Sequence, residues 1–332
     1  MTTFQAMTWN VENLFRPPLG AEEADLRRYQ RKLDLLAQVI DGLSPDVVAL
    51  QEVGGEEPLQ DLQEALGDAY PHRAVSAFPD SRGIRVAFLS KLAVEQRTDL
   101  VDFPPGPALE IRELSAVGEP RLVTRMGRGA LRIRLAKEGL TVDLITAHLK
   151  SKLLSFPRPG GEVGFSPRDE EERTQVAGLA LERRAAEAVA LRVRANELLE
   201  GNARTPLLVL GDLNDVPEAQ TSLILNGPPG NEVGTEAFHR RDEGDDARLF
   251  NLAPRIPEQR RFSRIHAGRR ELLDQILASE EFFPIEDGRR ALQEADSHVD
   301  FRDELPSVGD DPGEREEDVA PDHAPVTASF DL

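Results

Sequence analysis

The sequence predicts an α/β protein in which helices form layers around two β-sheets. Segments typical of strands outnumber amphipathic helices, and polar residues cluster at the ends of those strands. No internal repeat and no linker divides the chain, so we expect a single domain over residues 1–332. A simple array of parallel strand–helix–strand units would have about as many helices as strands, so the excess of strands favours two sheets.

Four segments are predicted to be helical. Apolar residues recur at spacings of three and four from about Glu22 to Asp41, and leucines mark a short helix that closes at Gly67. A long helix is predicted from about Asp169 to Glu200, with acidic residues in its first turn. Pro217 suits the first turn of a fourth helix, for which Asp215 would be the cap.

The predicted strands include one short run that is apolar throughout, Leu207 to Leu210, which Gly211 ends. Such a run is typical of a strand buried on both faces. Two further strands, separated by a turn that contains Gly139, are predicted to form a hairpin. Long loops are predicted over residues 155–168, 227–247 and 296–321. The predicted strands are residues 4–11, 47–52, 84–90, 130–135, 142–148, 207–210, 272–279 and 326–330.

Composition excludes several classes of protein. Apolar residues make up 39% of the chain and charged residues 30%, which is typical of a soluble globular protein. The net charge is −20, so a polyanionic substrate would need a local basic face. The chain has no cysteine, which excludes disulfides, zinc–thiolate sites and a cysteine nucleophile.

The sequence shows no targeting or membrane segment. The residues up to Trp9 contain neither a basic nor an apolar region of a signal peptide. No stretch approaches the roughly 18 apolar residues of a membrane span. We therefore expect a cytoplasmic protein, or a secreted one if the chain is a mature form from which a leader has been removed.

Polar clusters at the strand ends carry the candidate chemistry. They contain Asp, Glu, Asn and His, and oxygen-rich ligands suit Mg²⁺ or Mn²⁺ better than zinc or copper. Histidines beside carboxylates suit proton transfer or stabilisation of a phosphate oxyanion. The motifs of serine hydrolases, zinc proteases and nucleotide-binding loops are absent. The clusters are Asn10/Glu12/Asn13, Gln51/Glu52, His148/Lys150/Ser151/Lys152, Asp212/Asn214/Asp215, Asp274 and Asp322/His323.

These clusters, in this order, resemble the motifs of the endonuclease/exonuclease/phosphatase superfamily, which includes deoxyribonuclease I. The resemblance extends from Asn10 to His323 and implies a four-layer α/β/β/α sandwich with two packed mixed sheets. Gln275 departs from the family pattern, in which an aromatic residue or histidine is common. The motifs are Thr8-Trp-Asn-Val-Glu-Asn13, Leu50-Gln-Glu52, His148-Leu-Lys-Ser-Lys152, Gly211-Asp-Leu-Asn-Asp215, Leu273-Asp-Gln-Ile-Leu277 and Asp322-His-Ala-Pro-Val326.

The resemblance also implies a metal site and a catalytic group. Glu52 would be the main ligand of Mg²⁺ or Mn²⁺, supported by Asn10, Glu12 and Asp322. In isolation, Glu52 would be read as a solvated acid at the end of a strand.

Among the catalytic residues, Asp212 would orient or deprotonate the attacking water, and Asn214 would hold a phosphate oxygen. His323 would contact the scissile phosphate, with Asp274 fixing its tautomer and raising its pKa. His148 would lie at the phosphate or the leaving group. In isolation, Asp212 and Asn214 are more typical of a turn before the next helix than of a catalytic site.

Lys150 and Lys152 are candidate substrate-binding residues, although solvated lysines are an equal interpretation. The implied activity is metal-dependent hydrolysis of phosphodiesters by in-line attack of water, with DNA or RNA as the expected substrate. Alternatives are a phospholipid, phosphoinositide or small phosphate ester, and a non-catalytic binding module. Oligomeric state is not predictable from the sequence. A possible basic approach surface is formed by arginines 255, 260, 261, 264, 269 and 270, for which a solvated loop is the alternative.

Overall fold

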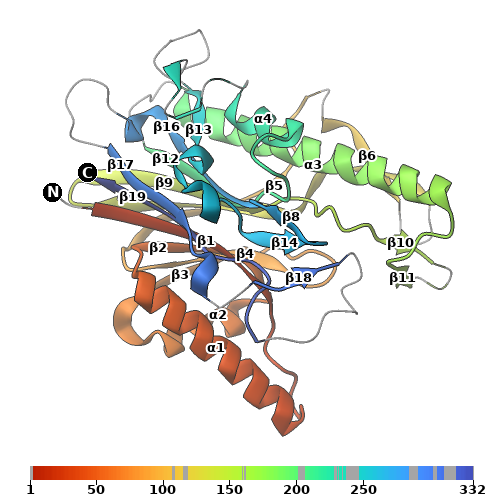
Figure 1. The fold of residues 1–332 in the computed structure, drawn as a ribbon, viewed down its shortest axis with the longest axis horizontal. Helices are drawn as coiled ribbons and strands as arrows, with labels where there is room; N and C mark the ends of the chain where they lie inside the picture. Colours follow the sequence, from red (N-terminus) through yellow and green to blue (C-terminus); the bar gives the residue numbers. More distant parts are fainter. Residues whose placement is uncertain are drawn as a thin grey trace.

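Two six-stranded β-sheets pack face to face, and helices cover the outer face of each (Figure 1). The four-layer sandwich expected from the resemblance is thereby confirmed in a computed structural model of the chain. The structure describes residues 3–106, 109–114, 119–158, 160, 162–200, 206–227, 230, 232–233, 235–236, 247–283, 291–301, 305–309 and 319–331.

The first sheet contains the amino-terminal and carboxy-terminal strands of the chain. β1 runs parallel to β2 and antiparallel to β19, so the sheet is mixed. The long helix α1 and the shorter α2 cover its outer face. In order across the sheet, the strands are β17 (Ala291–Ser297), β19 (Val326–Asp331), β1 (Thr3–Leu14), β2 (Val47–Val53), β4 (Arg85–Ser90) and β3 (His72–Val75), and the helices are α1 (Glu23–Leu43) and α2 (Glu56–Ala65).

The second sheet is also mixed, because β12 runs parallel to β9 and antiparallel to β16. The 30-residue helix α3 lies across its outer face beside the short helix α4. In order, the strands are β13 (Leu249–Asn251), β16 (Asp274–Ser279), β12 (Leu207–Asp212), β9 (Leu140–His148), β8 (Arg125–Lys137) and β5 (Val94–Asp102), and the helices are α3 (Glu170–Leu199) and α4 (Gln220–Asn226).

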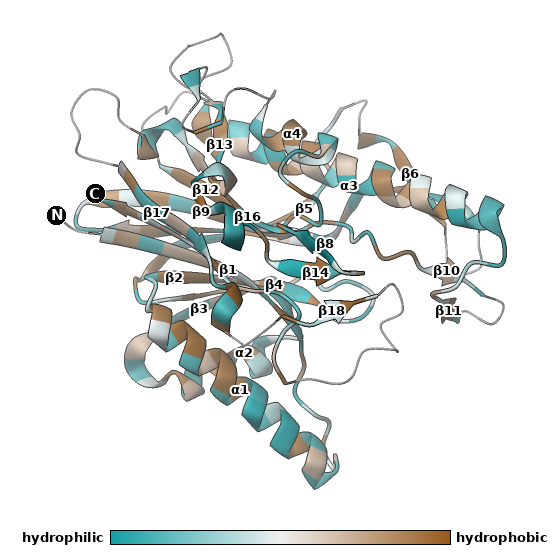
Figure 2. Ribbon diagram, in the orientation of Figure 1, coloured by the Kyte–Doolittle hydropathy of each residue, from teal (hydrophilic) through white to brown (hydrophobic). Residues whose placement is uncertain are grey.

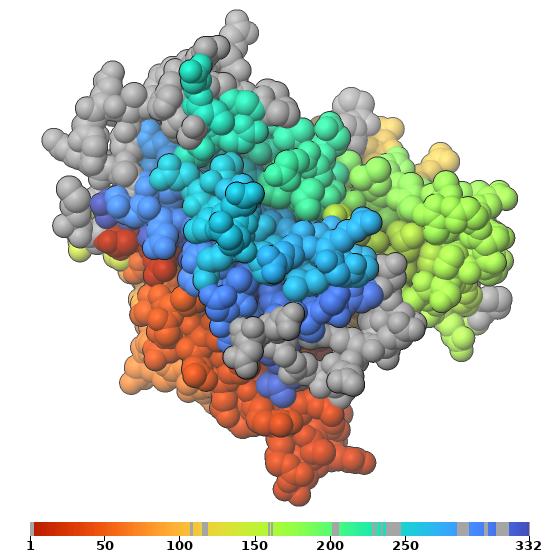
Figure 3. All heavy atoms as spheres, in the orientation of Figure 1, coloured from red at the N-terminus to blue at the C-terminus, as the bar shows by residue number. Residues whose placement is uncertain are grey.

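In the described part of the chain, three small β-sheets lie outside the two main sheets. β14 pairs with β15 and β18 on the surface, and β14 also forms an isolated bridge to His323. In Figure 3 the carboxy-terminal segments cover the surface between the amino-terminal layers and the layers from the middle of the chain. The small strands are β6 (Ile111–Leu114), β7 (Pro120–Val123), β10 (Phe156–Pro157), β11 (Val163–Gly164), β14 (Arg264–His266), β15 (Arg269–Glu271) and β18 (Ser307–Val308).

Apolar packing explains why β12 occupies a central position. Leu208 and Leu210 point into the core between the two sheets, whereas Leu207 and Val209 pack under α3 and α4. Alternate residues of a strand face opposite sides, so a run of four apolar residues serves two cores at once. In Figure 2 the strands of both sheets are largely hydrophobic, whereas the end of α1 that projects beyond the sheet is hydrophilic.

Several local predictions were wrong. Gly211 does not end the apolar strand, because β12 continues through it to Asp212. The fourth helix begins at Gln220 with Ala219 as its N-cap, so neither Pro217 nor Asp215 has the expected place in it.

The predicted loop at 155–168 contains the pair β10–β11, and the predicted loop at 296–321 contains β18. Strand β17 was not predicted. Most of the predicted loop at 227–247 lies outside the described residues. Within the described part of the chain, no helix combines the length and apolar character needed to cross a membrane.

Candidate active site

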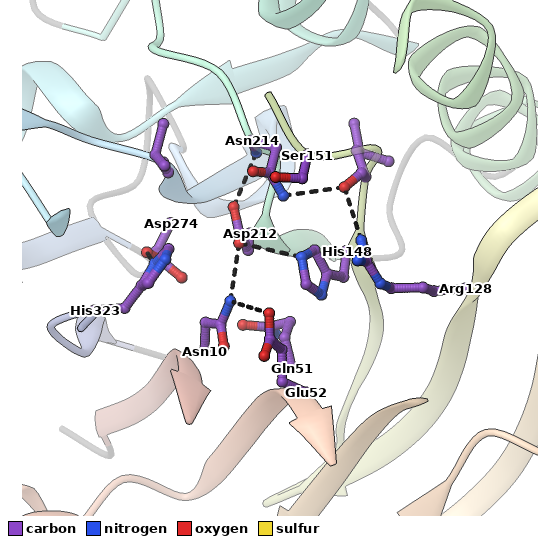
Figure 4. A network of polar contacts seen from close by, with 12 residues as sticks. Asn10, Gln51, Glu52, Arg128, His148, Ser151, Asp212, Asn214, Asp274 and His323 are labelled. Carbon is purple, nitrogen blue, oxygen red and sulfur yellow. Dashed lines mark hydrogen bonds and ion pairs between the residues drawn. The ribbon is translucent and has the colours of Figure 1, made fainter. Parts of the chain in front are cut away.

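The predicted site residues meet where β1 and β2 of one sheet end beside β9, β12 and β16 of the other (Figure 4). Strand register explains much of this meeting. Asp212 at the end of β12 pairs directly with His148 of β9 on one side and with Asp274 of β16 on the other. In the first sheet, Asn10 of β1 pairs with Gln51 of β2.

The backbone is strained at these strand ends. Glu12, Asn13, Glu52 and Asn214 all have positive φ angles, of 47°, 51°, 65° and 53°. Residues other than glycine seldom adopt this region, and such residues cluster at functional sites. The β1–β2 register also shifts between Asn10 and Leu14, a bulge of the kind that redirects side chains near active sites.

Asp212 is the central acceptor of the polar network. Its carboxylate accepts hydrogen bonds from Asn10 Nδ2 at 3.0 Å and from the backbone N–H of Asn214 at 2.9 Å. His148 Nε2 lies 3.3 Å from the same carboxylate. Burial raises the pKa of Asp212, although the positive charge of His323 opposes this shift. A buried carboxylate with a raised pKa is suited to accept a proton.

His323 and Asp274 form a tight buried pair. His323 Nδ1 lies 2.6 Å from Asp274 Oδ2, and the Ser263 hydroxyl accepts the backbone N–H of Asp274. Burial disfavours a charged imidazole, but the carboxylates of Asp274 and Asp322 outweigh it and raise the pKa of His323 to about 9. His323 is therefore an imidazolium at neutral pH.

His148 is in the opposite charge state. Burial lowers its pKa well below the ordinary value, and the nearby positive charges of Arg128, His323, Arg82 and Lys150 lower it further. A neutral imidazole that donates from Nε2 to Asp212 leaves Nδ1 as an acceptor. His148 Nδ1 and Asp274 Oδ1 are both buried without a hydrogen-bond partner among the described residues.

Glu52 and Asn10 lie together at the ends of β2 and β1. Glu52 Oε1 is 3.4 Å from Asn10 Nδ2, and Glu52 Oε2 accepts the backbone N–H of Asn13 at 3.0 Å. The Asn10 amide oxygen accepts the backbone N–H of Glu12 at 3.0 Å, so the carboxylate of Glu52 and this amide oxygen are the hard ligands that the two residues offer to Mg²⁺ or Mn²⁺.

The other two predicted metal ligands hold the strand ends together. Glu12 Oε2 accepts the backbone N–H of Asp322 at 3.0 Å, which joins the end of β1 to the His323 segment. Asp322 itself accepts a hydrogen bond from Arg264 Nε at 3.1 Å. Both carboxylates are therefore already engaged with protein groups.

A second group of possible ligands lies deeper. Asp212, Asp274 and His323 offer ligand atoms within 4.8 Å of one another, so this buried group could also hold a metal ion. One of these atoms is taken up by the short bond between His323 and Asp274. Glu52 is half-buried, whereas Asn10 is as buried as Asp212 and its Oδ1 accepts the backbone N–H of Glu12.

The two predicted substrate-binding lysines differ in their contacts. Lys150 Nζ donates to the carbonyls of Ser151 and Leu153, and burial together with Arg128 lowers its pKa to about 8. Lys152 Nζ forms ion pairs with Glu271 at 2.9 Å and Asp215 at 3.2 Å. Asn214 donates its amide to the carbonyl of Leu149 at 3.0 Å, so it also fixes the segment that carries Lys150.

Asp215 and Gln275 have structural contacts. Asp215 accepts hydrogen bonds from Thr221 Oγ1 and Arg184 Nε, so it joins α3 to α4 instead of capping a helix. Gln275 donates to the carbonyl of Asp215 at 2.6 Å and accepts from Asn251 at 2.6 Å. Its amide thus fastens the segment that follows Asp212.

Sequence reasoning missed a set of residues that hold the His148 segment. Glu187 of α3 is buried and accepts the backbone N–H groups of Lys150 and Gly127, while Arg184 donates to the Lys150 carbonyl. Arg128 of β8 donates to the carbonyl of Leu149 at 3.2 Å. The charged pair on the otherwise apolar face of the long helix was the only signal in the sequence.

Four of the six arginines of the predicted basic approach surface contact other parts of the protein, two of them through carboxylates. Arg260 pairs with Asp296 and Asp300, and Arg264 pairs with Asp322. Arg261 donates to backbone carbonyls, and Arg270 stacks over the ring of Phe262. These contacts favour the alternative in which the arginines stabilise the loop.

Comparison with solved structures identifies the fold. TDP2 from Caenorhabditis elegans is similar over 99% of this chain and 98% of its own, with 16% identity and a TM-score of 0.53. TDP2 from D. rerio, in complex with a single-strand DNA product, is similar over 100% of both chains, with 14% identity and a TM-score of 0.54. The human Nocturnin catalytic domain with a bound sulfate anion matches over 99% of this chain and 94% of its own, with 15% identity and a TM-score of 0.52.

Sequence comparison identifies the family. No curated protein matches the sequence. A family model described as the Endonuclease/Exonuclease/phosphatase family matches residues 7–297, which contain all the site residues named above except Asp322 and His323. The chain therefore belongs to the endonuclease/exonuclease/phosphatase family.

Proposed function

We propose that this protein is a metal-dependent phosphodiesterase that hydrolyses nucleic acid. The observation that carries the proposal is the buried group of Asp212, His323, Asp274 and His148, in which a proton acceptor and an imidazolium lie side by side. Hydrolysis of a phosphodiester needs both a group that activates water and positive charge at the phosphate oxygens.

In the proposed reaction, a water oxygen forms a bond to phosphorus while its proton passes to Asp212. The bond to the leaving oxygen breaks, that oxygen takes up a proton from solvent, and Asp212 later releases its proton to solvent, so the products are a phosphomonoester and an alcohol. His323, held by Asp274, neutralises charge on a non-bridging oxygen. His148 remains neutral beside Asp212 and the leaving side of the site.

The chemistry of the donors supports Mg²⁺ or Mn²⁺ as the cofactor, with Glu52 and Asn10 as its ligands. Such an ion would offset negative charge on the phosphate. Calorimetry can separate this pair from the deeper group, because Glu52→Ala should abolish Mn²⁺ binding and Asp274→Asn should retain it. The opposite result would assign the metal to Asp212, Asp274 and His323.

The proposed activity can be tested on plasmid DNA, single-stranded DNA, RNA and bis-p-nitrophenyl phosphate, each with Mg²⁺, Mn²⁺ or EDTA. We expect hydrolysis of at least one nucleic acid and of the small diester, abolished by EDTA and restored by metal. Activity that resists EDTA would contradict the metal mechanism. Inactivity on every substrate would favour a non-catalytic binding module. The complete set of acids and histidines in the site argues against such a module.

A second substrate class is favoured by the charge of the chain. The net charge of −20 and the internal pairing of the predicted arginine surface disfavour a long polyanion. A phospholipid head group or a small phosphate ester would avoid this repulsion. Salt separates the two, because binding of a polyanion weakens steeply as salt rises and binding of a small ester does not. The comparison with D. rerio TDP2, whose complex contains single-strand DNA, supports the first class.

A further inference from the structure

Three positive side chains gather beside His148 from three separate segments. Arg82 precedes β4, Arg128 lies near the start of β8, and Lys150 follows β9. The Asp80 carboxylate holds the two arginines together, 3.2 Å from Arg128 Nε and 3.6 Å from Arg82 Nε. Arg128 also donates to the carbonyl of Leu149, the residue after His148, and Figure 4 shows it next to the His148 ring. We call Arg82, Arg128 and Lys150 the cationic group.

The charge of the cationic group is only partly balanced by its surroundings. Asp80 is one carboxylate shared by two guanidinium groups. The carboxylate beside Lys150, that of Glu187, accepts the Lys150 backbone N–H and is shared with Arg183. Among the described residues, Lys150 Nζ donates to the carbonyls of Ser151 and Leu153. The neighbouring cations Lys152 and Arg184 differ, because the carboxylates of Asp215 and Glu271 pair with them. An excess of positive charge beside a buried site is notable in a chain whose net charge is −20.

The two arginines of this group have side-chain N–H donors that remain available to a ligand. The hydrogen bonds of Arg128 use Nε and Nη1, so its Nη2 makes none to the described residues. Arg82 contacts Asp80 through its backbone N–H and Nε, and its side chain is 54% exposed. Guanidinium donors in a fixed fork match the oxygens of a phosphate. One arginine is thus held rigidly by the protein, and the other can be reached from solvent.

We propose that the cationic group binds a second phosphate of the substrate, next to the scissile phosphate on the His148 side. This inference rests on the proposed phosphodiesterase activity and narrows its substrate class. A substrate with one phosphate, such as a lipid head group, would be served by His323 and the metal ligands alone. Positive charge beyond those groups stabilises a substrate that carries at least two neighbouring phosphates, as an oligonucleotide does.

A matched pair of substrates isolates this contact. The p-nitrophenyl phosphate diester of thymidine has one phosphate, and the same compound with a phosphate on its other hydroxyl has two; both the 3′ and the 5′ isomer would be used. For the wild type, we expect one two-phosphate isomer to have a KM at least tenfold lower than the one-phosphate diester. Arg82→Ala and Arg128→Ala should each raise that KM about tenfold, on the scale of a lost hydrogen bond to a charged group.

Arg82→Ala should change kcat and KM for the one-phosphate diester by less than twofold, because the exposed Arg82 side chain holds no segment of the catalytic group. Arg128→Ala is compared only through the ratio of its losses on the two substrates, because Arg128 also holds the His148 segment. Arg128→Lys should recover part of the loss, because it restores the charge without the fork. Arg194→Ala is the matched control, since Arg194 pairs with Glu197 near the end of α3 that leads toward the start of β12, away from Asp212. If a variant lost equal activity on the one-phosphate and two-phosphate substrates, Arg82 and Arg128 would only stabilise the structure of the site and would not bind a second phosphate. No loss on either substrate would exclude the second phosphate site.

A binding measurement separates failure of this inference from failure of the proposed function. Fluorescence anisotropy of labelled (dT)₈ in EDTA needs no turnover. The slope of log K against log salt should be about 0.7 shallower for Arg82→Ala than for the wild type, as expected when one phosphate contact is lost from a single strand. If the wild type hydrolyses nothing but shows this difference, the phosphodiesterase activity fails and the phosphate site stands. An unchanged slope would overturn the site, whatever the activity.

Discussion

The two buried histidines of the site lie in surroundings of opposite charge. His323 faces carboxylates, which raise its pKa to about 9 even though burial favours the neutral ring. His148 lies beside Arg128, Arg82 and Lys150, and both its burial and these cations lower its pKa. Asp212 separates the two rings and is within hydrogen-bonding reach of His148.

This difference shows how one residue type can carry two roles in one site. Histidine titrates near neutral pH, so its neighbours determine which form is present. The carboxylates beside His323 keep it positive, as a group that stabilises a phosphate oxyanion must be. Burial and the neighbouring cations keep His148 neutral, so its Nδ1 is available as an acceptor. Two environments that shift the pKa values of two residues in opposite directions assign different roles to those residues.

Removing the proton acceptor or the imidazolium should have the largest effect. We expect Asp212→Ala and His323→Ala each to lower kcat on bis-p-nitrophenyl phosphate by at least ~10²-fold, the usual scale for a lost acid–base group. His72→Ala, at the start of the edge strand β3, is the control for loss of a histidine and should have near-normal kcat. Near-normal turnover in both site variants would contradict the assignment of the two roles.

Asp274→Asn should have the next largest effect, because it removes the carboxylate that maintains the charge of His323. The pKa of His323 should fall from about 9 toward its ordinary value near 6.5, and kcat at pH 8 should fall by roughly 10- to 100-fold. NMR titration of the imidazole protons in EDTA measures the pKa directly. A His323 pKa that stays near 9 would show that Asp322 and Asp212 suffice, and that Asp274 only positions the ring.

The fold and most of the site could be predicted because a strand and the polar residues at its end are adjacent in the sequence. An apolar run followed by Asp212 and Asn214 marks both a buried strand and the edge at which it ends. The order of six such motifs placed Asn10, Glu52, His148 and Asp212 at one edge. Gly211 was misread because glycine usually interrupts strands. Here a Cβ at Gly211 would lie 2.0 Å from the carbonyl oxygen of Ala147, so the close approach of β9 requires glycine inside the strand.

The residues around His148 could not be predicted, because they act through tertiary contacts. Arg128 lies within a strand whose neighbouring arginines, Arg132 and Arg134, pair with the buried Asp143, and nothing in its local sequence distinguishes it. Glu187 and Arg184 are the two buried charged residues of α3. Their roles depend on which loop lies against which helix, and periodicity carries no information on that.

The pH dependence of stability gives the smallest effect and the most direct test of the contrast between the histidines. Below the ordinary pKa of 6.5, His148 binds a proton in the unfolded chain but stays neutral in the folded protein. His148 therefore lowers stability as pH falls. Folded His323 retains its proton up to about pH 9, so its contribution is complete below pH 6.5 and is lost as pH rises toward 9. Between pH 5.5 and 7.5 the two trends oppose each other.

Single variants should therefore expose opposite slopes. Relative to the wild type, stability of His148→Asn should fall with rising pH, and that of His323→Asn should rise, each by about 1 kcal/mol between pH 5.5 and 7.5. Urea unfolding in EDTA at pH 5.5, 6.5 and 7.5 measures these slopes. Slopes of the same sign in the two variants would mean that the histidines share one charge state, and the division of the site into an acidic and a cationic side would fail.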